Sequence, residues 1–236
     1  MGVRLEVCID SAEGLAEAVA GGADRIELCA ALALGGLTPS VGLIELAMRC
    51  GVPVVAMIRP RAGDFTWSEV EVAMMEAEIA TVRTAGLHGV VLGASLPDGR
   101  LDLPVLLRLV AASRGLELVL HRCIDLTPDM GAALEEAISL GFHRILTSGG
   151  ETTAELGAAR IAALVRQAAG RITVMPGSGV TPGNAAMLKG LGIREIHASC
   201  SVSTPVSGRA VEMGFAPSLR RQTHADAVRA LRKALE

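Results

Sequence analysis

The sequence predicts a single (β/α)8 barrel, the TIM-barrel fold, and two observations support this prediction. Short apolar runs typical of strands alternate with stretches of helical spacing along all 236 residues. These runs recur at intervals of roughly 20–35 residues, which is the length of one strand–helix unit, and they form eight units. An open, doubly wound sheet is the alternative, but that architecture gives no reason for eight repeats. We therefore expect one domain over residues 1–236.

The predicted elements follow one another in a regular order. The strands span approximately residues 4–8, 24–28, 53–58, 88–93, 116–121, 143–147, 171–175 and 194–199. Helical spacing of apolar residues covers residues 11–20, 67–85, 104–113, 130–140, 155–168, 182–189 and 223–235. A glycine that can end a helix in the left-handed conformation precedes every second strand, at Gly22, Gly86, Gly141 and Gly192. Alternate units are therefore built alike, as expected where alternate strands form common layers of a barrel core.

Composition and charge exclude several classes of protein. The net charge is −3 and aromatic residues make up only 2% of the chain, so we expect neither a nucleic-acid surface nor attachment to a membrane. The five cysteines form an odd set without a Cys-x-x-Cys pair, and the first residues lack the apolar segment of a signal peptide. These features predict a cytoplasmic protein with reduced thiols. Residues 28–44 are uncharged but contain glycine and proline, which indicates a loop over the site or against another subunit.

Two early strands carry the same Glu-x-Cys sequence, at Glu6–Cys8 and at Glu27–Cys29. Side chains two residues apart on a strand share one face, so these polar groups point together into the barrel. Burying carboxylates and thiols is costly unless they meet partners, a ligand or water. The carboxyl ends of barrel strands, here called the mouth, usually hold the functional site. We therefore predict a site at the mouth.

Ionisable side chains at the ends of later strands extend this predicted site. The acid–base candidates are Glu6, Glu27, His121, Asp125 and His197. The candidate ligand-binding residues are Arg59, Arg61, Arg122, Ser148, Gly177, Gly179 and Ser199. We expect a carboxylate to orient His121, and a small phosphorylated or carboxylated metabolite to bind between an arginine and the glycines. The alternative is an ion-pair layer that plugs the barrel, with Glu6 and Glu27 paired to Arg59 and with Arg25 paired to its neighbours.

The segment Gly-Ser-Gly-Val-Thr-Pro at residues 177–182 follows the seventh strand and leads into a helix. Thr181 is the expected N-cap and Pro182 the first helical residue. Backbone N–H groups at a helix N-terminus attract anions, and barrels often bind phosphate after strands seven and eight. Asn184 and Ser199 could add donors. A plain glycine turn without a ligand is the alternative explanation.

Several motifs also resemble the CutC family, the so-called copper homeostasis proteins. They are Glu-Val-Cys-Ile-Asp-Ser (6–11), Gly-Ala-Asp-Arg-Ile-Glu-Leu-Cys (22–29), Gly-Gly-Leu-Thr-Pro-Ser (35–40), Ile-Arg-Pro-Arg-Ala-Gly-Asp-Phe (58–65), His-Arg-Cys-Ile-Asp (121–125), Leu-Thr-Ser-Gly (146–149) and Met-Pro-Gly-Ser-Gly-Val (175–180). The resemblance implies a (β/α)8 barrel, a cytoplasmic location, a homo-oligomer (dimer or tetramer) and a role in copper homeostasis. The segment 202–221 diverges from the family pattern.

The resemblance also implies Cys8 and Cys29 as ligands of Cu(I). Strands about 4.8 Å apart would let both sulfur atoms reach one soft ion, with Met57 as a candidate third ligand. Buried cysteines that act only as small apolar residues are the competing explanation. Two functions therefore stand side by side: copper binding, and an enzyme or sensor for a small anionic metabolite. A passive scaffold would instead have a mouth filled by side chains.

Overall fold

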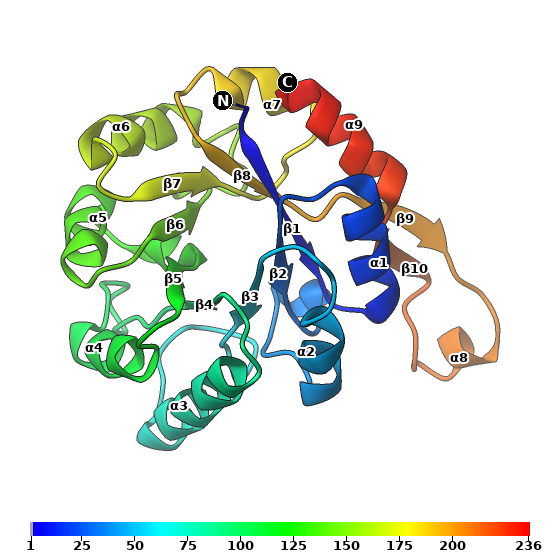
Figure 1. Cartoon of the computed structure of the whole chain (residues 1–236), viewed down its shortest axis with the longest axis horizontal. Helices are drawn as coiled ribbons and strands as arrows, with labels where there is room; N and C mark the ends of the chain where they lie inside the picture. The colour runs from blue at the N-terminus through cyan, green and yellow to red at the C-terminus, as the bar shows by residue number, and fades with distance from the viewer. Residues whose placement is uncertain (1) are drawn as a thin grey trace.

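The computed structural model describes residues 2–236 and confirms the (β/α)8 barrel (Figure 1). The parallel barrel strands are β1 (Arg4–Ile9), β2 (Arg25–Leu28), β3 (Val54–Met57), β4 (Gly89–Leu92), β5 (Glu117–Leu120), β6 (Arg144–Thr147), β7 (Thr173–Pro176) and β8 (Glu195–Ala198). Consecutive strands pair from β1 through β7, and β8 pairs with β1, so β7 and β8 are the two ends of the hydrogen-bonded sheet. β7 and β8 lie next to each other and nearly close the barrel, and the pairing of β8 with β1 places the first and last strands side by side.

Helices surround the strands as an outer ring (Figure 1). They are α1 (Ala12–Gly21), α2 (Val41–Ala47), α3 (Glu69–Thr84), α4 (Leu103–Ala112), α5 (Met130–Ser139), α6 (Ala158–Ala168), α7 (Pro182–Lys189) and α9 (Ala225–Leu235). Side-chain caps begin several of them: Ser11, Ser68 and Asp129 each accept a backbone N–H of the first turn. None of the helices in residues 2–236 combines the length and the apolar character that a membrane crossing requires.

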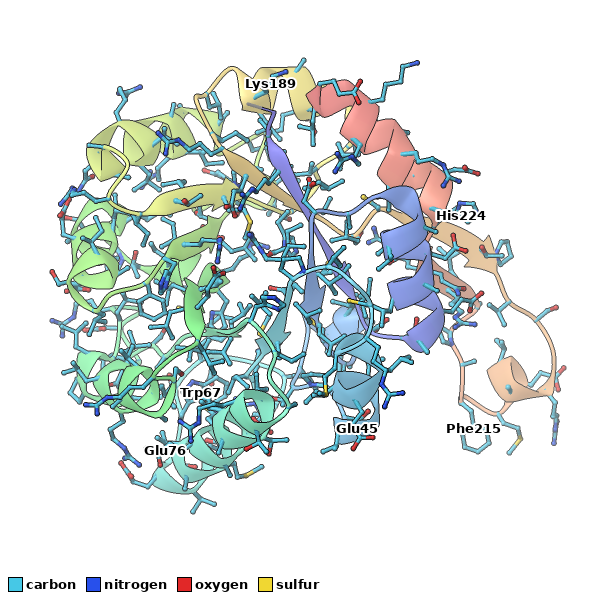
Figure 2. The ribbon with its side chains drawn as sticks, in the orientation of Figure 1. Glu45, Trp67, Glu76, Lys189, Phe215 and His224 are labelled. Carbon is cyan, nitrogen blue, oxygen red and sulfur yellow. The ribbon has the colours of Figure 1, made fainter. Side chains whose placement is uncertain are left out.

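Short irregular elements add to the mouth. The uncharged segment after β2 forms the expected loop as far as Ser40 and contains the 3-10 turn η1 (Leu32–Leu34), but its last residues, from Val41, belong to α2. A second turn, η2 (Arg122–Leu126), follows β5. The segment between β8 and α9 forms an antiparallel hairpin, β9 (Ser201–Pro205) and β10 (Leu219–Thr223), with α8 (Arg209–Glu212) between its strands. The hairpin projects from the barrel, and Phe215 lies near its far end (Figure 2). Sequence analysis did not predict this hairpin.

The barrel wall separates two apolar clusters. Residues that point outward from the strands, such as Leu5, Val7 and Ile9 of β1, pack with the helices in the larger cluster. Residues that point into the barrel form the smaller one: Cys29, Val55, Met57, Val91, Val119, Leu146 and Met175. Burying one large aliphatic side chain contributes about 1.5–3 kcal/mol, so the outer cluster supplies most of the hydrophobic stabilisation.

An ion-pair layer crosses the barrel interior at the strand starts. The layer consists of Glu6, Arg25, Glu117, Arg144 and Glu195. The Arg25 Nε atom lies 2.5 Å from Glu6 Oε2, and the other end of the same guanidinium pairs with Glu195. Arg144 joins Glu195 at 2.9 Å and Glu117 at 2.8 Å. An ion-pair layer therefore exists, and Arg25 pairs with its neighbours in it as the alternative expected. Arg144 is its second cation, whereas Arg59 lines the mouth and pairs with neither Glu6 nor Glu27.

The burial of Arg25 predicts a large cost for its removal. Arg25 is only 4% exposed, and Arg25→Leu would leave the carboxylates of Glu6 and Glu195 short of a buried partner. We expect the free energy of unfolding in urea to fall by about 3–5 kcal/mol. The matched control is Arg108→Leu, which removes an exposed arginine from its pairs with Glu69 and Glu76 and should cost at most about 1 kcal/mol. Equal losses in the two variants would contradict the structural importance of the layer.

Candidate functional site

A cavity of about 480 Å³ opens at the mouth of the barrel. Its walls come from β1, β2, β3, β6 and β8, from the segments after β2, β3, β5, β7 and β8, from the hairpin strands β9 and β10, and from α9. Leu32 and Gly35 line it, so the uncharged loop after β2 contributes to the mouth as expected. The mouth is therefore hollow, and the passive scaffold with a filled mouth does not describe this structure.

Three candidate metal ligands meet in this cavity, on three neighbouring strands. The Cys8 sulfur, a Glu27 carboxylate oxygen and a His197 ring nitrogen all lie within 4.8 Å of one another, and all three residues are buried. Strand register explains the meeting, because Cys8 pairs with Glu27 across β1–β2 and Glu6 pairs with His197 across β1–β8. We call Cys8, Glu27 and His197 the metal-ligand triad.

The Glu6 carboxylate orients His197. The His197 Nδ1 atom lies 2.8 Å from Glu6 Oε1, and its Nε2 atom lies 3.8 Å from Glu27 Oε2. Burial opposes a charge on the imidazole, but Glu27, Cys8 and Glu6 outweigh it and hold the pKa of His197 well above its usual range. Burial also opposes a charge on Glu6, yet Arg25 and His197 lower the pKa of Glu6 to about 2. Glu6 is thus a fixed anion that links the ion-pair layer to the triad.

Glu27 is less completely paired than Glu6. Its Oε1 atom is buried without a hydrogen-bond partner among the described residues. Burial is the main reason that the pKa of Glu27 is raised, and the nearby charge of Glu6 adds to the effect. A buried carboxylate oxygen without a donor is costly in the free protein, and a metal ion or a proton donor on a ligand would satisfy it.

Cys29 occupies a different environment from Cys8. Its side chain is fully buried in the inner apolar cluster, and its sulfur lies 3.5 Å from Glu27 Oε2. Burial, with the charge of Glu27, raises the pKa of the Cys29 thiol well above its usual range. The close group of candidate ligands contains Cys8, Glu27 and His197 without Cys29. Met57 does line the cavity.

Arg59 lies on the opposite side of the cavity from β8. Its guanidinium donates to the carbonyl oxygens of Leu34, Gly36 and Gly63, at 2.8–3.1 Å. Its Nε atom is buried without a partner among the described residues. Burial and the neighbouring Arg61 lower the pKa of Arg59. Arg59 thus shapes the loops after β2 and β3 and remains a cation without a carboxylate partner.

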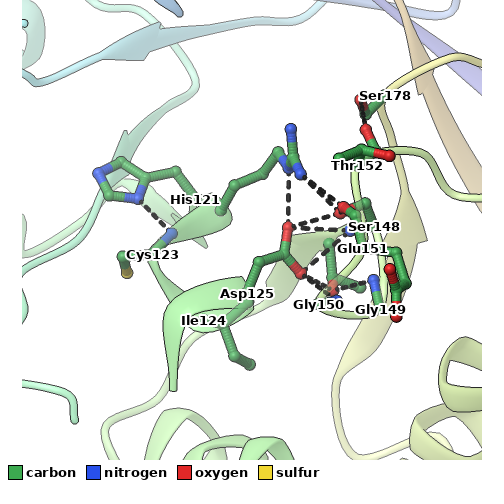
Figure 3. A network of polar contacts seen from close by, with 12 residues as sticks. His121, Cys123, Ile124, Asp125, Ser148, Gly149, Gly150, Glu151, Thr152 and Ser178 are labelled. Atoms are coloured by element: carbon green, nitrogen blue, oxygen red, sulfur yellow. Dashed lines mark hydrogen bonds and ion pairs between the residues drawn. The ribbon is translucent and has the colours of Figure 1, made fainter. Parts of the chain in front are cut away.

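His121 stands beside Arg59 and is held by the backbone. Its Nδ1 atom accepts the N–H of Cys123 at 3.2 Å (Figure 3), whereas sequence analysis expected a carboxylate in this role. The ring lies against Gly93, where an added Cβ would stand 2.5 Å from the ring carbon Cε1. Burial, with the charge of Arg59, lowers the pKa of His121 to about 3. The imidazole is therefore neutral at pH 7, with Nε2 carrying the proton and having no partner among residues 2–236.

Asp125 acts as a structural link between η2 and the end of β6. Its oxygens accept hydrogen bonds from the Thr147 hydroxyl, from the N–H groups of Ser148 and Gly150, and from the Arg122 guanidinium (Figure 3). These bonds occupy the carboxylate, and neither Asp125 nor Ser148 lines the cavity. Arg122 does line it, while paired to Asp125 at 2.7 Å.

Arg61 lies outside the cavity. Its guanidinium pairs with Glu71 of α3 at 2.5 Å, donates to the Thr66 carbonyl and stacks on the Trp67 ring. Groups of the local loop and of the first turn of α3 therefore occupy the hydrogen-bond donors of Arg61. Unlike Arg59, Arg61 does not line the cavity.

The loop after β7 has the expected cap. Thr181 is the N-cap of α7 and Pro182 its first residue, and the Asn184 side chain accepts the Thr181 N–H. Gly177 allows close packing, because a Cβ there would stand 2.6 Å from Leu146 and 3.4 Å from His197. Gly179 and Ser199 line the cavity, and the Ser199 hydroxyl contacts that of Ser201 at 2.9 Å.

Sequence analysis missed several cavity residues, among them Arg221, Cys200 and Ser201. Burial raises the pKa of Cys200 to about 12, so its thiol stays protonated. Arg221 comes from β10, and no motif in the diverged segment indicated that this strand would return to the mouth. Phe65 also lines the cavity: its ring lies 4.9 Å from the Arg59 guanidinium carbon and 4.5 Å from the His121 ring centre.

The buried neutral His121 predicts a specific pH dependence of stability. The pKa of His121 is about 3 in the folded chain and near 6.5 when unfolded, so the unfolded state binds more protons between these values. The contribution of neutral His121 to the free energy of unfolding is complete above pH 6.5. It decreases as the pH falls toward 3, by about 1.4 kcal/mol per pH unit. Between pH 7.5 and 5.0, His121→Gln should lose less unfolding free energy in urea than wild type. The exposed His143→Gln is the control, and identical slopes in all three proteins would contradict the assignment.

Comparisons with known proteins identify the family of this chain. The model of the CutC family matches residues 3–202. A CutC family protein from Sinorhizobium medicae is 52% identical over 236 residues, 99% of this chain and 96% of that protein. The human copper homeostasis protein cutC homolog is 44% identical over 209 residues, 88% of this chain and 76% of that protein. A crystal structure of CutC from Streptococcus agalactiae superposes with a TM-score of 0.80 at 32% identity, covering 84% of this chain and 98% of that one. This chain therefore belongs to the CutC family.

Proposed function

We propose that this protein acts in copper homeostasis by binding Cu(I) at the barrel mouth. Cys8 and His197 are the main ligands and Glu27 is the third. One observation supports this proposal above the others: the three donor atoms lie within 4.8 Å of one another in a cavity that opens to the outside. The names of the human and streptococcal relatives, both copper homeostasis proteins, point in the same direction.

The donor set suits a soft metal ion. Cu(I) prefers thiolate and thioether ligands, and imidazole also binds copper well. Cys8 supplies the sulfur, His197 supplies the imidazole, and the thioether of Met57 lines the same cavity. Glu27 Oε1 has no hydrogen-bond partner among the described residues, so a bound ion would satisfy this buried oxygen. These donors would hold the ion as cargo, which fits a role in storage or transfer.

The surroundings of the triad favour binding as well. A ligating histidine generally needs a partner on its other nitrogen to fix the orientation of the ring, and Glu6 has this role for His197 at 2.8 Å. Glu6 is in turn held by Arg25 of the ion-pair layer. All five cysteines are free, and we place the protein in the cytoplasm, where thiols remain reduced and available to copper.

The proposal predicts which substitutions abolish Cu(I) binding. In an anaerobic competition titration with a chromophoric Cu(I) chelator, wild type should bind one ion per chain. Cys8→Ala and His197→Ala should each weaken binding by at least about tenfold, or 1.4 kcal/mol, because each removes a direct ligand. Glu6→Gln removes the partner that orients His197 and should weaken binding by about 10–100-fold.

Two cysteine variants serve as controls in the same titration. Cys50→Ala removes a thiol that contacts the Val52 carbonyl, outside the cavity, and should leave affinity unchanged. Cys29→Ala distinguishes binding by the metal-ligand triad from binding by the Cys8–Cys29 pair that the family resemblance implied. We expect this variant to retain most of the affinity for Cu(I). If Cys29→Ala loses as much Cu(I) affinity as Cys8→Ala, the ligands are the two cysteines and the triad is wrong. Unchanged affinity in the double variant Cys8→Ala/His197→Ala would exclude the site.

A further inference from the structure

We propose that the same cavity also binds a small organic anion, a carboxylate or a phosphate monoester, between Arg59 and Arg221. The proposal uses side chains other than the metal-ligand triad, so it stands or falls independently of copper. A volume of about 480 Å³ is within the usual range for small-molecule sites.

The fixed charges that line the cavity are mainly positive. Three arginines line it, Arg59, Arg122 and Arg221, against one carboxylate, Glu27. Arg122 is neutralised by Asp125 at 2.7 Å. In residues 2–236 neither Arg59 nor Arg221 has a carboxylate within ion-pair distance. Two arginines without an ion-pair partner therefore line one cavity, and guanidinium groups bind carboxylates and phosphates through paired hydrogen bonds.

Arg59 is the stronger indication because it is buried. It is 5% exposed, three backbone carbonyls occupy part of its donor set, and its Nε atom has no partner in the described chain. The carbonyl dipoles stabilise the guanidinium charge but do not neutralise it. Burying this charge away from water therefore still costs free energy, and a bound anion would offset that cost. His121 adds a second unpartnered donor, Nε2, on the same side of the cavity and against the same Phe65 ring.

Backbone donors complete the site on the opposite side. Ser178, Gly179 and Val180 line the cavity at the start of α7, and their N–H groups have no acceptor among the described residues. Ser178 and Gly179 both have positive φ, at 77° and 70°, and successive N–H groups in such turns form concave anion sites. This loop follows β7, where barrels commonly bind phosphate.

Arg221 gives the site a contact beyond the part of the chain that the family model covers. That model ends at residue 202, and Arg221 lies on β10, opposite Ser203 of β9. Neighbouring residues on a strand point to opposite faces, so Arg221 reaches the cavity and Arg220 does not. The hairpin thus supplies a recognition residue, which makes Arg221 a determinant of anion specificity.

The alternation of Arg220 and Arg221 provides a matched pair for the experiment. Binding of inorganic phosphate and of succinate is measured by calorimetry and thermal shift on the full chain without copper, at constant ionic strength. Wild type should bind one or both probes saturably, one per chain. Arg221→Ala should weaken binding about two- to fivefold, as for an exposed ion pair. Arg220→Ala, which removes the same charge, should bind like wild type.

A second variant tests the buried end of the site. Arg59→Gln removes the buried cation and should weaken binding by about tenfold or more, as expected for a hydrogen bond to a charged group. If this variant does not fold, judged by circular dichroism, the comparison of Arg221→Ala with Arg220→Ala decides the question alone. Binding of phosphate only, or of succinate only, identifies the class of anion.

Two outcomes would overturn the proposal. One is the absence of saturable binding of either probe to wild type, and the other is equal affinity in Arg221→Ala and Arg220→Ala. Cys8→Ala keeps every residue of the anion site and should bind the probe normally. Failure of the copper proposal would therefore appear in the Cu(I) titration alone, and failure of the anion proposal in the probe titration alone.

Discussion

The contact between Glu6 and Arg25 is the interaction on which the rest of the mouth depends. Glu6 accepts from Arg25 on one side and holds His197 on the other. Through Arg25, the same carboxylate belongs to a continuous set of ion pairs that reaches β5, β6 and β8. Charges buried in a barrel must be paired, so this pairing fixes the positions of several strands together. The network therefore also fixes the orientation of the His197 ring, through its contact with Glu6.

The two ends of the barrel interior differ in how completely their polar groups are paired. At the strand starts, Arg25 and Glu195 each meet opposite charges. At the mouth, Glu27 Oε1, Arg59 Nε and His121 Nε2 have no partner among residues 2–236. In the layer at the strand starts, Arg144 Nη1 makes no hydrogen bond but still lies 2.8 Å from the Glu117 carboxylate, whereas the three atoms at the mouth have no charged partner of this kind in the described chain. Buried polar atoms without partners call for an explanation, such as a ligand, an ion or an ordered water. This difference follows the general division of barrels into a stabilising amino-terminal end and a functional carboxyl-terminal end.

Sequence reasoning predicted the fold and the inward direction of Cys8, Glu27, Arg59, His121 and His197, because eight repeats and strand parity are properties of local sequence. It could not predict which of these groups meet. Cys8 stands beside His197 because β8 closes against β1, a pairing between the two ends of the sequence. Asp125 and Arg61 found partners in nearby loops and a helix, which residue type alone does not reveal. The position of Arg221 depends on a hairpin without a recognisable motif.

The proposed copper and anion sites occupy different strands of one small cavity. The triad lies on β1, β2 and β8, whereas Arg59 and His121 follow β3 and β5. The two sets of groups therefore come from different strands around one cavity, and either set can be substituted without removing the other. Both would nevertheless share one volume of about 480 Å³, so their charges would interact at short range and little screened by salt. By thermodynamic linkage, any change that an anion makes in the affinity for copper must equal the change that copper makes in the affinity for the anion. If both ligands bind as proposed, the occupancy of each depends on the concentration of the other through this linkage.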